Sequence, residues 1–262
     1  KVKTFFSKNC VFDGFSLWWI TKLCNKDNTY DYKWYYKLKK SLFNNKKTKF
    51  NRLTFFIVFT LKLFKNFLRD VIFLILIKLI SSTRFKKINK SICFYSIMDN
   101  LVNKKNVCYD RLYGHTPLKK NINKNFYLIN VIKHYDFILN FFKIRNNFKK
   151  LKLQYVLINE FISISELFRI HFITIKFFFK LNFFLRKNKD LFKIKNKDCC
   201  NILEPLLLSS FSGEIQISLI NAISIKNFIK NKNINYFISY IEFNPQSRSV
   251  YYFLKKGSIQ TK

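Results

Sequence analysis

Acidic and basic side chains follow a predicted strand near the end of the sequence. The residues Ile241-Glu-Phe-Asn-Pro-Gln-Ser-Arg248 come directly after an apolar run and before a predicted helix. Ligands of open α/β sheets bind at the carboxyl ends of strands. Glu242 is therefore predicted to contact a sugar hydroxyl or to act as a base, and Arg248 to bind phosphate or carboxylate through two parallel hydrogen bonds. A purely structural role for both side chains is the alternative.

A second polar stretch, Tyr109-Asp-Arg-Leu-Tyr-Gly-His-Thr-Pro117, is predicted to be a loop after the first strand of the sheet. Asp110 and Arg111 are candidates for binding a hydroxylated ligand. His115 is a possible acid or base, because the pKa of histidine lies near neutrality. A turn with a surface ion pair explains the same residues.

A third polar stretch, Ser209-Ser-Phe-Ser-Gly-Glu214, precedes a predicted helix. Ser212 and Gly213 are predicted to present free backbone N–H groups at the helix N-terminus, where phosphate or sugar oxygens can bind. A plain helix cap, with Glu214 in the first turn, is the alternative.

Several common cofactor sites find little support in the sequence. Only four of the 262 residues are glycine, which argues against a glycine-rich phosphate loop or dinucleotide fingerprint. The six cysteines form no Cys-x-x-Cys pair, and the three histidines are far apart, so no metal site is predicted. Reduced thiols in a cytoplasmic protein fit this cysteine usage.

The positive charge needs an explanation before it is assigned a partner. Lys and Arg number 49 and Asp and Glu 14, which gives a net charge of +35. Lys, Phe, Asn and Ile share A/T-rich codons, so codon bias alone could raise the charge. In that case the lysines should be dispersed over the folded surface, with no basic stripe beside exposed aromatic residues. Attraction to anionic lipid or to RNA is the functional alternative.

Short apolar runs alternate with longer helical stretches in the second half of the sequence. Strands are predicted at 91–97, 126–132, 154–158 and 236–241, and helices at 164–186, 212–229 and 246–256. This alternation predicts an α/β fold with a parallel sheet. Near the N-terminus, Asp13-Gly14 predicts a turn, Ser16 is a plausible N-cap of a helix, and 32–43 is a second aromatic helical stretch.

Residues 53–81 form the most apolar part of the sequence, yet Lys62, Lys65, Arg69, Asp70 and Lys78 interrupt it. A transmembrane helix needs roughly 20 apolar residues with few charges. The segment therefore predicts one or two helices at a membrane interface, with basic flanks that favour an anionic surface. A buried helix of a core is the alternative. A membrane transporter is disfavoured, because no uninterrupted apolar span occurs.

The order of four motifs resembles that of bacterial surface carbohydrate biosynthesis proteins, glycosyltransferases of capsule or lipopolysaccharide pathways. These motifs are Gly14-Phe-Ser-Leu-Trp-Trp-Ile20, Asp110-Arg-Leu-Tyr-Gly114, Ser209–Gly213 and Ile241–Arg248, and they span nearly the whole sequence. The resemblance implies two facing Rossmann-like domains, of which this sequence would be the N-terminal, acceptor-side one, with helices on both faces of its sheet and an apolar helical insertion. It implies boundaries at 1–52 (N-terminal part), 53–88 (membrane-associating insert) and 89–262 (main part), with the donor domain outside this fragment.

The expected activity is transfer of a sugar from an activated donor to a membrane-associated glycan acceptor, at the inner face of the cell membrane. The complete protein is expected to bind a nucleotide-sugar donor. The fragment itself is expected to bind no cofactor and no specific nucleic acid. Glu242 is the expected catalytic residue, and the substrate-binding residues are Arg248, Asp110, Arg111, Ser212 and Gly213. These residues are expected to converge on one rim of the sheet, because right-handed crossovers bring strand ends to the same edge. An RNA-binding ribosomal or organellar protein is the alternative.

Overall fold

The computed structural model describes 1–21, 24, 52–81, 89–98, 101–104, 107–110, 125–131, 133–150, 155–194, 197–231, 233–239 and 245–257. The aromatic stretch predicted as a helix at 32–43 lies outside the described residues, as do Arg111, His115 and Glu242.

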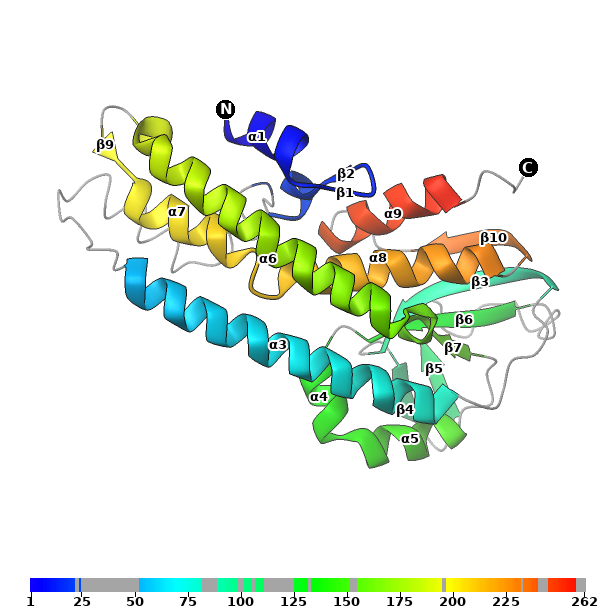
Figure 1. Ribbon diagram of the computed structural model, residues 1–262. Helices are drawn as coiled ribbons and strands as arrows, with labels where there is room; N and C mark the ends of the chain where they lie inside the picture. Colours follow the sequence, from blue (N-terminus) through cyan, green and yellow to red (C-terminus); the bar gives the residue numbers. More distant parts are fainter. Residues whose placement is uncertain are drawn as a thin grey trace. The chain divides into compact units, whose positions relative to one another are not determined.

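Four parallel strands form the central sheet, in the order β10-β3-β6-β7. The strands are β3 (Asn89–Ile97), β6 (Asn125–Asn130), β7 (Tyr155–Leu157) and β10 (Asn233–Ser239). All four were predicted from their apolar runs, and the parallel pairing of an α/β fold is confirmed. Helices surround this sheet (Figure 1).

Alternate strand residues belong to two different apolar cores. In one core Cys93, Tyr95, Leu128 and Val156 pack with residues of α8 (Glu214–Asn231) and α9 (Pro245–Gly257). In the other core Ile129, Tyr155 and Leu157 pack with residues of α3 (Arg52–Ser81), α4 (His134–Leu139) and α5 (Phe141–Lys150). Strands buried on both sides read as continuous apolar runs, which is why sequence pattern alone locates them.

The chain divides into two compact units that each combine distant segments. Unit 1 comprises 1–67, 168–219 and 244–249, and unit 2 comprises 68–167, 220–243 and 250–262. The central sheet lies entirely in unit 2. The boundaries expected at residues 52 and 88 stay a prediction.

Unit 1 begins with α1 (Val2–Asn9) and a two-strand hairpin of β1 (Val11–Phe12) and β2 (Phe15–Ser16). The predicted turn at Asp13-Gly14 is confirmed: both residues have positive φ, 47° and 88°, as a tight hairpin turn requires. The helix predicted after Ser16 is instead a short 3₁₀ segment, Leu17–Ile20, followed by extended backbone at Thr21. Leu17 and Ile20 are fully buried, so packing rather than helical propensity fixes this segment.

Parts of two long helices, 52–67 and 168–187, belong to unit 1. The apolar segment predicted as one or two helices is the single helix α3, and α6 (Ile164–Lys187) closely matches its predicted bounds. Within unit 1 they run antiparallel, because Phe59 stacks on Phe178 at 3.9 Å between ring centroids while Phe67 packs on Phe168 at 4.9 Å (Figure 1). Shorter elements among the described residues include α7 (Cys200–Ser209) and two antiparallel strand pairs. These pairs are β4 (Leu101–Lys104) with β5 (Val107–Asp110) and β8 (Lys193–Ile194) with β9 (Lys197–Asp198).

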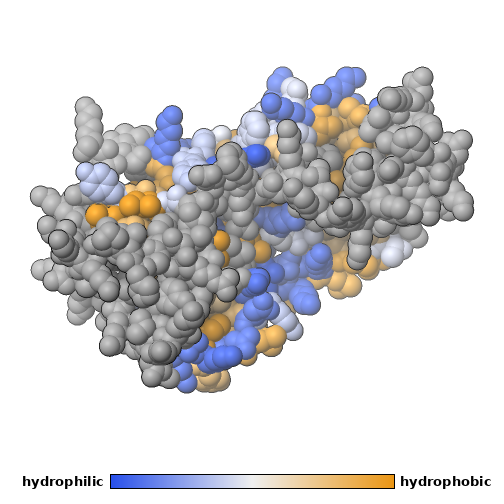
Figure 2. Space-filling view, turned by 180° about the vertical axis from the view of Figure 1, so that it is seen from behind, coloured by the Kyte–Doolittle hydropathy of each residue, from blue (hydrophilic) through white to orange (hydrophobic). Residues whose placement is uncertain are grey.

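By length and composition, one helical stretch among the described residues, Cys200–Lys230, is apolar enough to cross a membrane. Its most apolar window is 67% buried within the protein. A buried core helix meets the same criterion, so this stretch is weak support for a membrane crossing. On the face shown in Figure 2, hydrophilic and hydrophobic residues are interspersed wherever side chains are described.

Candidate functional site

Buried polar side chains gather at the carboxyl edge of the parallel sheet in unit 2. Asn130 is the last residue of β6, His134 opens α4 four residues later, and Asn159 follows the end of β7. Their exposed fractions are 1%, 2% and 0%. The carboxyl edge is where ligands of parallel α/β sheets bind, so this cluster is the candidate site.

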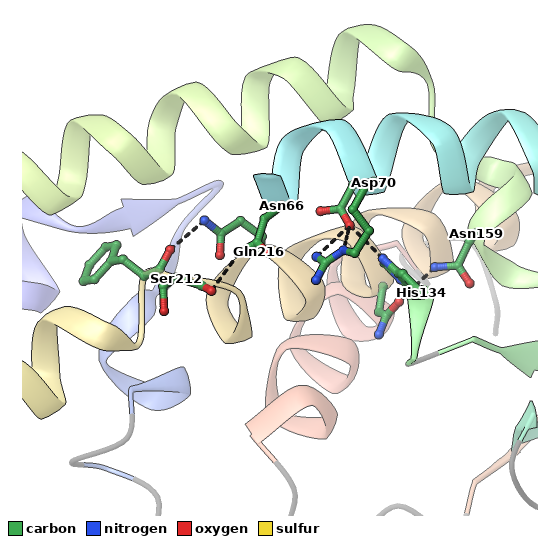
Figure 3. Close-up of polar contacts among 9 residues, drawn as sticks. Asn66, Asp70, His134, Asn159, Ser212 and Gln216 are labelled. Atoms are coloured by element: carbon green, nitrogen blue, oxygen red, sulfur yellow. Dashed lines mark hydrogen bonds and ion pairs between the residues drawn. The ribbon is translucent and has the colours of Figure 1, made fainter. Parts of the chain in front are cut away.

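The centre of the cluster is a hydrogen-bonded pair, Asp70 and His134. Nδ1 of His134 lies 2.9 Å from Oδ1 of Asp70, and the two side chains point toward each other (Figure 3). Nε of Arg69 donates to the same oxygen at 2.7 Å. The imidazole also stacks on Phe73, with 3.8 Å between ring centroids. α3 therefore supplies the carboxylate, its cationic partner and the aromatic wall, while the β6–α4 connection supplies the histidine.

The environment sets both the protonation and the tautomer of His134. Burial lowers the pKa of the imidazole below its usual 6.5, although the hydrogen bond and charge of Asp70 oppose this shift. The ring is therefore neutral at pH 7. Because an ionised carboxylate only accepts hydrogen bonds, we assign the single ring proton to Nδ1, which leaves the lone pair of Nε2 available as an acceptor.

Three buried polar atoms of this edge have no hydrogen-bond partner among the described residues: Nε2 of His134, Oδ1 of Asn130 and Nδ2 of Asn221. Each residue is nevertheless held by another bond. Nδ2 of Asn130 donates to Oη of Tyr95 at 2.7 Å, and Nδ2 of Asn159 donates to Oδ1 of Asn221 at 3.0 Å. Buried polar groups are nearly always paired, so a cluster of unpaired ones marks a place suited to a ligand or to chemistry.

The predicted site residue Ser212 has a structural role. Its backbone N–H, predicted to be free, donates to the carbonyl oxygen of Ser209 at 3.0 Å, and its Oγ donates to the same oxygen at 2.7 Å. Its carbonyl oxygen accepts a 2.7 Å bond from Nδ2 of Asn66 on α3 (Figure 3). The tight turn between α7 and α8 uses these groups, so the prediction of a free N–H at Ser212 is wrong. Gly213 has φ of +148° in this turn, and its ligand contact stays a prediction.

The predicted site residue Arg248 packs against Trp19 in unit 1. Nη1 of Arg248 donates to the carbonyl oxygen of Trp19 and to Sγ of Cys24, both at 3.4 Å. The guanidinium lies 5.8 Å and Nζ of Lys3 5.1 Å from the centroid of the Trp19 ring, which is 41% exposed. These contacts hold Arg248 in place, and its binding of phosphate stays a prediction.

The position of Asp110 differs from the expected loop. Asp110 is the last residue of β5 and pairs with Leu101 of β4 in a separate two-stranded sheet, so the beginning of the predicted loop is a strand. Ser212, Gly213 and Arg248 belong to unit 1 and Asp110 to unit 2, while Arg111 and Glu242 lie outside the described residues. The expected convergence of all six on one rim therefore stays a prediction.

The structure brings together residues that the sequence pattern did not select. Asp70 and His134 are 64 positions apart, and Asn159 and Asn221 are 62 apart. One signal was present: Asp70 is a carboxylate within the most apolar segment of the sequence. His134 also follows a predicted strand, as two of the three predicted site stretches do.

Two of the buried cysteines have raised pKa values. Burial raises the pKa of Cys10 to about 12 and also raises the pKa of Cys93, so both thiols stay protonated at neutral pH. Among the described residues, no group of three His, Cys, Asp or Glu is placed to hold a metal ion.

No family model, no curated protein and no solved structure matches this chain. The function is therefore inferred from the residues at the sheet edge and from the short motifs of the sequence.

Proposed function

We propose that this chain is part of a glycosyltransferase of surface polysaccharide synthesis, which transfers a sugar from an activated donor to a membrane-associated glycan acceptor. The observation that carries the proposal is the buried Asp70–His134 pair at the carboxyl edge of a parallel sheet. The reaction class rests on the resemblance of four short motifs to those of surface carbohydrate biosynthesis proteins, and a nucleotide sugar is the expected donor. The expected location is the inner face of the cell membrane, at an anionic lipid surface.

The finer description of the fold belongs to the same proposal. The chain passes from β3 to β6 and β7 on one side and then returns to β10 on the other side of β3. A sheet wound in two directions from one strand is Rossmann-like, and in folds of that kind the ligand crevice opens beside that strand at the carboxyl edge. Glu242, which follows β10, is expected near this crevice.

His134 has the properties of a base for glycosyl transfer. The acceptor hydroxyl must lose its proton as its oxygen bonds to the anomeric carbon, while the bond to the leaving diphosphate breaks and its electron pair stays on the phosphate. Nε2 of His134 accepts that proton, and Asp70 stabilises the imidazolium that forms. The stack on Phe73 and the bond to Asp70 fix the plane of the ring. Glu242 is the alternative base.

The test replaces the base and keeps its support. In His134→Asn, Nδ2 of the new side chain can still donate to Asp70, but no basic nitrogen is present. The full-length protein is incubated with labelled nucleotide sugars and with vesicles that carry a glycolipid acceptor. Wild type is expected to label the acceptor, and the variant about 10²–10⁴-fold more slowly, the range for loss of a general base.

The matched control is His171→Asn, which removes a second buried histidine, located on α6 beside Phe67. Transfer per vesicle-bound protein should be unchanged in this control. Full transfer by His134→Asn would assign His134 to structure and leave Glu242 as the base. Tight binding of wild type to one RNA at physiological salt, with no transfer from any nucleotide sugar, would favour the RNA-binding alternative.

A further inference from the structure

The antiparallel helices α3 and α6 of unit 1 each present a row of apolar side chains to solvent. On α3 the row is Leu53, Ile57, Leu61 and Phe64, which are 52–71% exposed. On α6 it is Phe168, Phe172, Phe179 and Phe183, which are 49–69% exposed. Both rows follow helical spacing of three, four or seven residues, so each occupies one face of its helix. Soluble surfaces rarely expose so many large apolar side chains together, which indicates that something covers this face.

An apolar groove of about 350 Å³ lies between the two rows. The Phe59–Phe178 stack bounds one end, and Phe67 with Phe168 bounds the other. Phe64 and Phe172 line the groove and are 61% and 69% exposed. Its volume is within the range of small-molecule pockets, roughly 300–1,000 Å³, but its lining is almost wholly hydrocarbon, which suits an aliphatic chain.

Exposed lysines border this apolar surface on both helices. Lys62 and Lys65 on α3, and Lys176, Lys180 and Lys187 on α6, are all exposed. Because an α-helix has 3.6 residues per turn, the lysines of each helix lie next to its apolar row, on the side opposite the groove. Neither 52–67 nor 168–187 contains an Asp or Glu. The surface is therefore apolar at its centre and basic along both margins.

We propose that this face of α3 and α6 docks on an anionic lipid bilayer, with one lipid hydrocarbon chain held in the groove. A bilayer offers hydrocarbon to the centre of the surface and anionic headgroups to its basic margins. A second copy of the chain fits less well, because a symmetric pairing would bring together two surfaces that lack Asp and Glu. The biological setting, a transferase that meets its acceptor at a membrane, rests on the proposed function, whereas the lipid binding does not.

Vesicle flotation tests the docking surface. The full chain should float with vesicles of phosphatidylcholine and phosphatidylglycerol, and at least about tenfold less with phosphatidylcholine alone, as expected for several basic residues near the surface. The double variant Phe64→Gln, Phe172→Gln should not float with either kind of vesicle. The matched control Phe142→Gln removes a Phe on α5 that is 75% exposed, and it should float as wild type does.

The groove is tested with phosphatidylglycerol that carries a nitroxide label on its acyl chain. Wild type should give an immobilised component in the electron paramagnetic resonance spectrum. Thr60→Trp fills the groove that Thr60 lines and should abolish this component, whereas Val58→Trp, an exposed position outside the groove lining, should keep it. Circular dichroism of each variant checks that the helices are retained.

Three outcomes would overturn the proposal. The first is that wild type binds neither kind of vesicle, and the second is that wild type and the double Gln variant bind vesicles equally. The third is that wild type does not bind vesicles but forms a dimer in equilibrium with the monomer, and that the double Gln variant abolishes this dimer. The last result would make this face an interface between copies. Intact vesicle binding without sugar transfer would contradict only the proposed function.

Discussion

His134 combines full enclosure with an unpaired ring nitrogen, an energetically costly arrangement. Leaving a buried acceptor such as Nε2 unpaired costs about 1–3 kcal/mol. The bond to Asp70 and the stack on Phe73 offset part of that cost, but neither uses Nε2. A residue that lowers stability in this way, at the sheet edge where ligands bind, is better explained by function than by packing.

The lowered pKa of His134 makes a prediction for acid stability. Because the folded pKa lies below the unfolded value of about 6.5, the unfolded chain binds the proton first as pH falls. This contribution to stability is therefore fully present above the unfolded pKa and declines as pH falls below it. Between about pH 7.5 and about pH 5.5, the urea midpoint of unfolding should fall more for wild type than for His134→Asn. Equal losses in the two proteins would contradict the assignment of a neutral, buried imidazole.

At the residue scale, the sequence could not predict the candidate site. Asp70 and His134 meet only because α3 packs against the β6–α4 connection, a contact between segments 64 positions apart. Polar residues near strand ends and helix N-termini were the predicted site residues, yet Ser212 shows that a local turn can use such groups internally. Local pattern identifies side chains capable of chemistry, and tertiary packing decides which of them meet.

Prediction from sequence was more successful at the element scale. Each strand of the central sheet was found within a few residues, because burial on both faces leaves an unbroken apolar run. The helix expected after Ser16 failed, because Leu17 and Ile20 are fixed by burial in a 3₁₀ segment too short to show helical periodicity. The single helix α3 was ambiguous because its apolar residues lie on two opposite faces, one packed and one exposed.

The N-terminus of α6 supports a prediction about helix capping. Oγ of Ser163 accepts a hydrogen bond from the N–H of Glu166 at 3.1 Å, and Oε2 of Glu166 accepts one from the N–H of Ser163 at 2.9 Å. This is a capping box, and loss of such an N-cap costs about 1 kcal/mol. Ser163→Ala should therefore lower the free energy of unfolding by about 1 kcal/mol in urea titrations. Ser7→Ala, at an exposed serine inside α1, is the control and should change it by no more than about 0.5 kcal/mol.

At the scale of the whole molecule, the net charge of +35 has two explanations, codon bias and attraction to an anionic partner. The lysines were expected to be dispersed if bias alone raised their number, with no basic stripe beside exposed aromatic residues. On α6, exposed Lys176 and Lys180 lie beside exposed Phe172 and Phe179. RNA could use such an arrangement as well, since bases stack on aromatic rings. The facing row on α3 is mostly Leu and Ile, which offer hydrocarbon but no stacking surface, and this favours lipid.

Salt dependence separates the two partners. Binding of a basic surface to RNA is driven by counterion release, so log Kd should rise steeply with log salt and binding should be nearly lost at about 0.15 M ionic strength. Binding to anionic vesicles should weaken less, because insertion of Phe64 and Phe172 into hydrocarbon is unaffected by screening. The measurement is a salt titration of the full chain with a single-stranded RNA and with phosphatidylglycerol vesicles. The double variant Lys176→Gln, Lys180→Gln should weaken vesicle binding at low salt by about 2 kcal/mol and leave the residual binding at high salt unchanged. If RNA binding survived physiological salt while the vesicles were released, the exposed face of α3 and α6 would serve a nucleic acid and the membrane setting would be wrong.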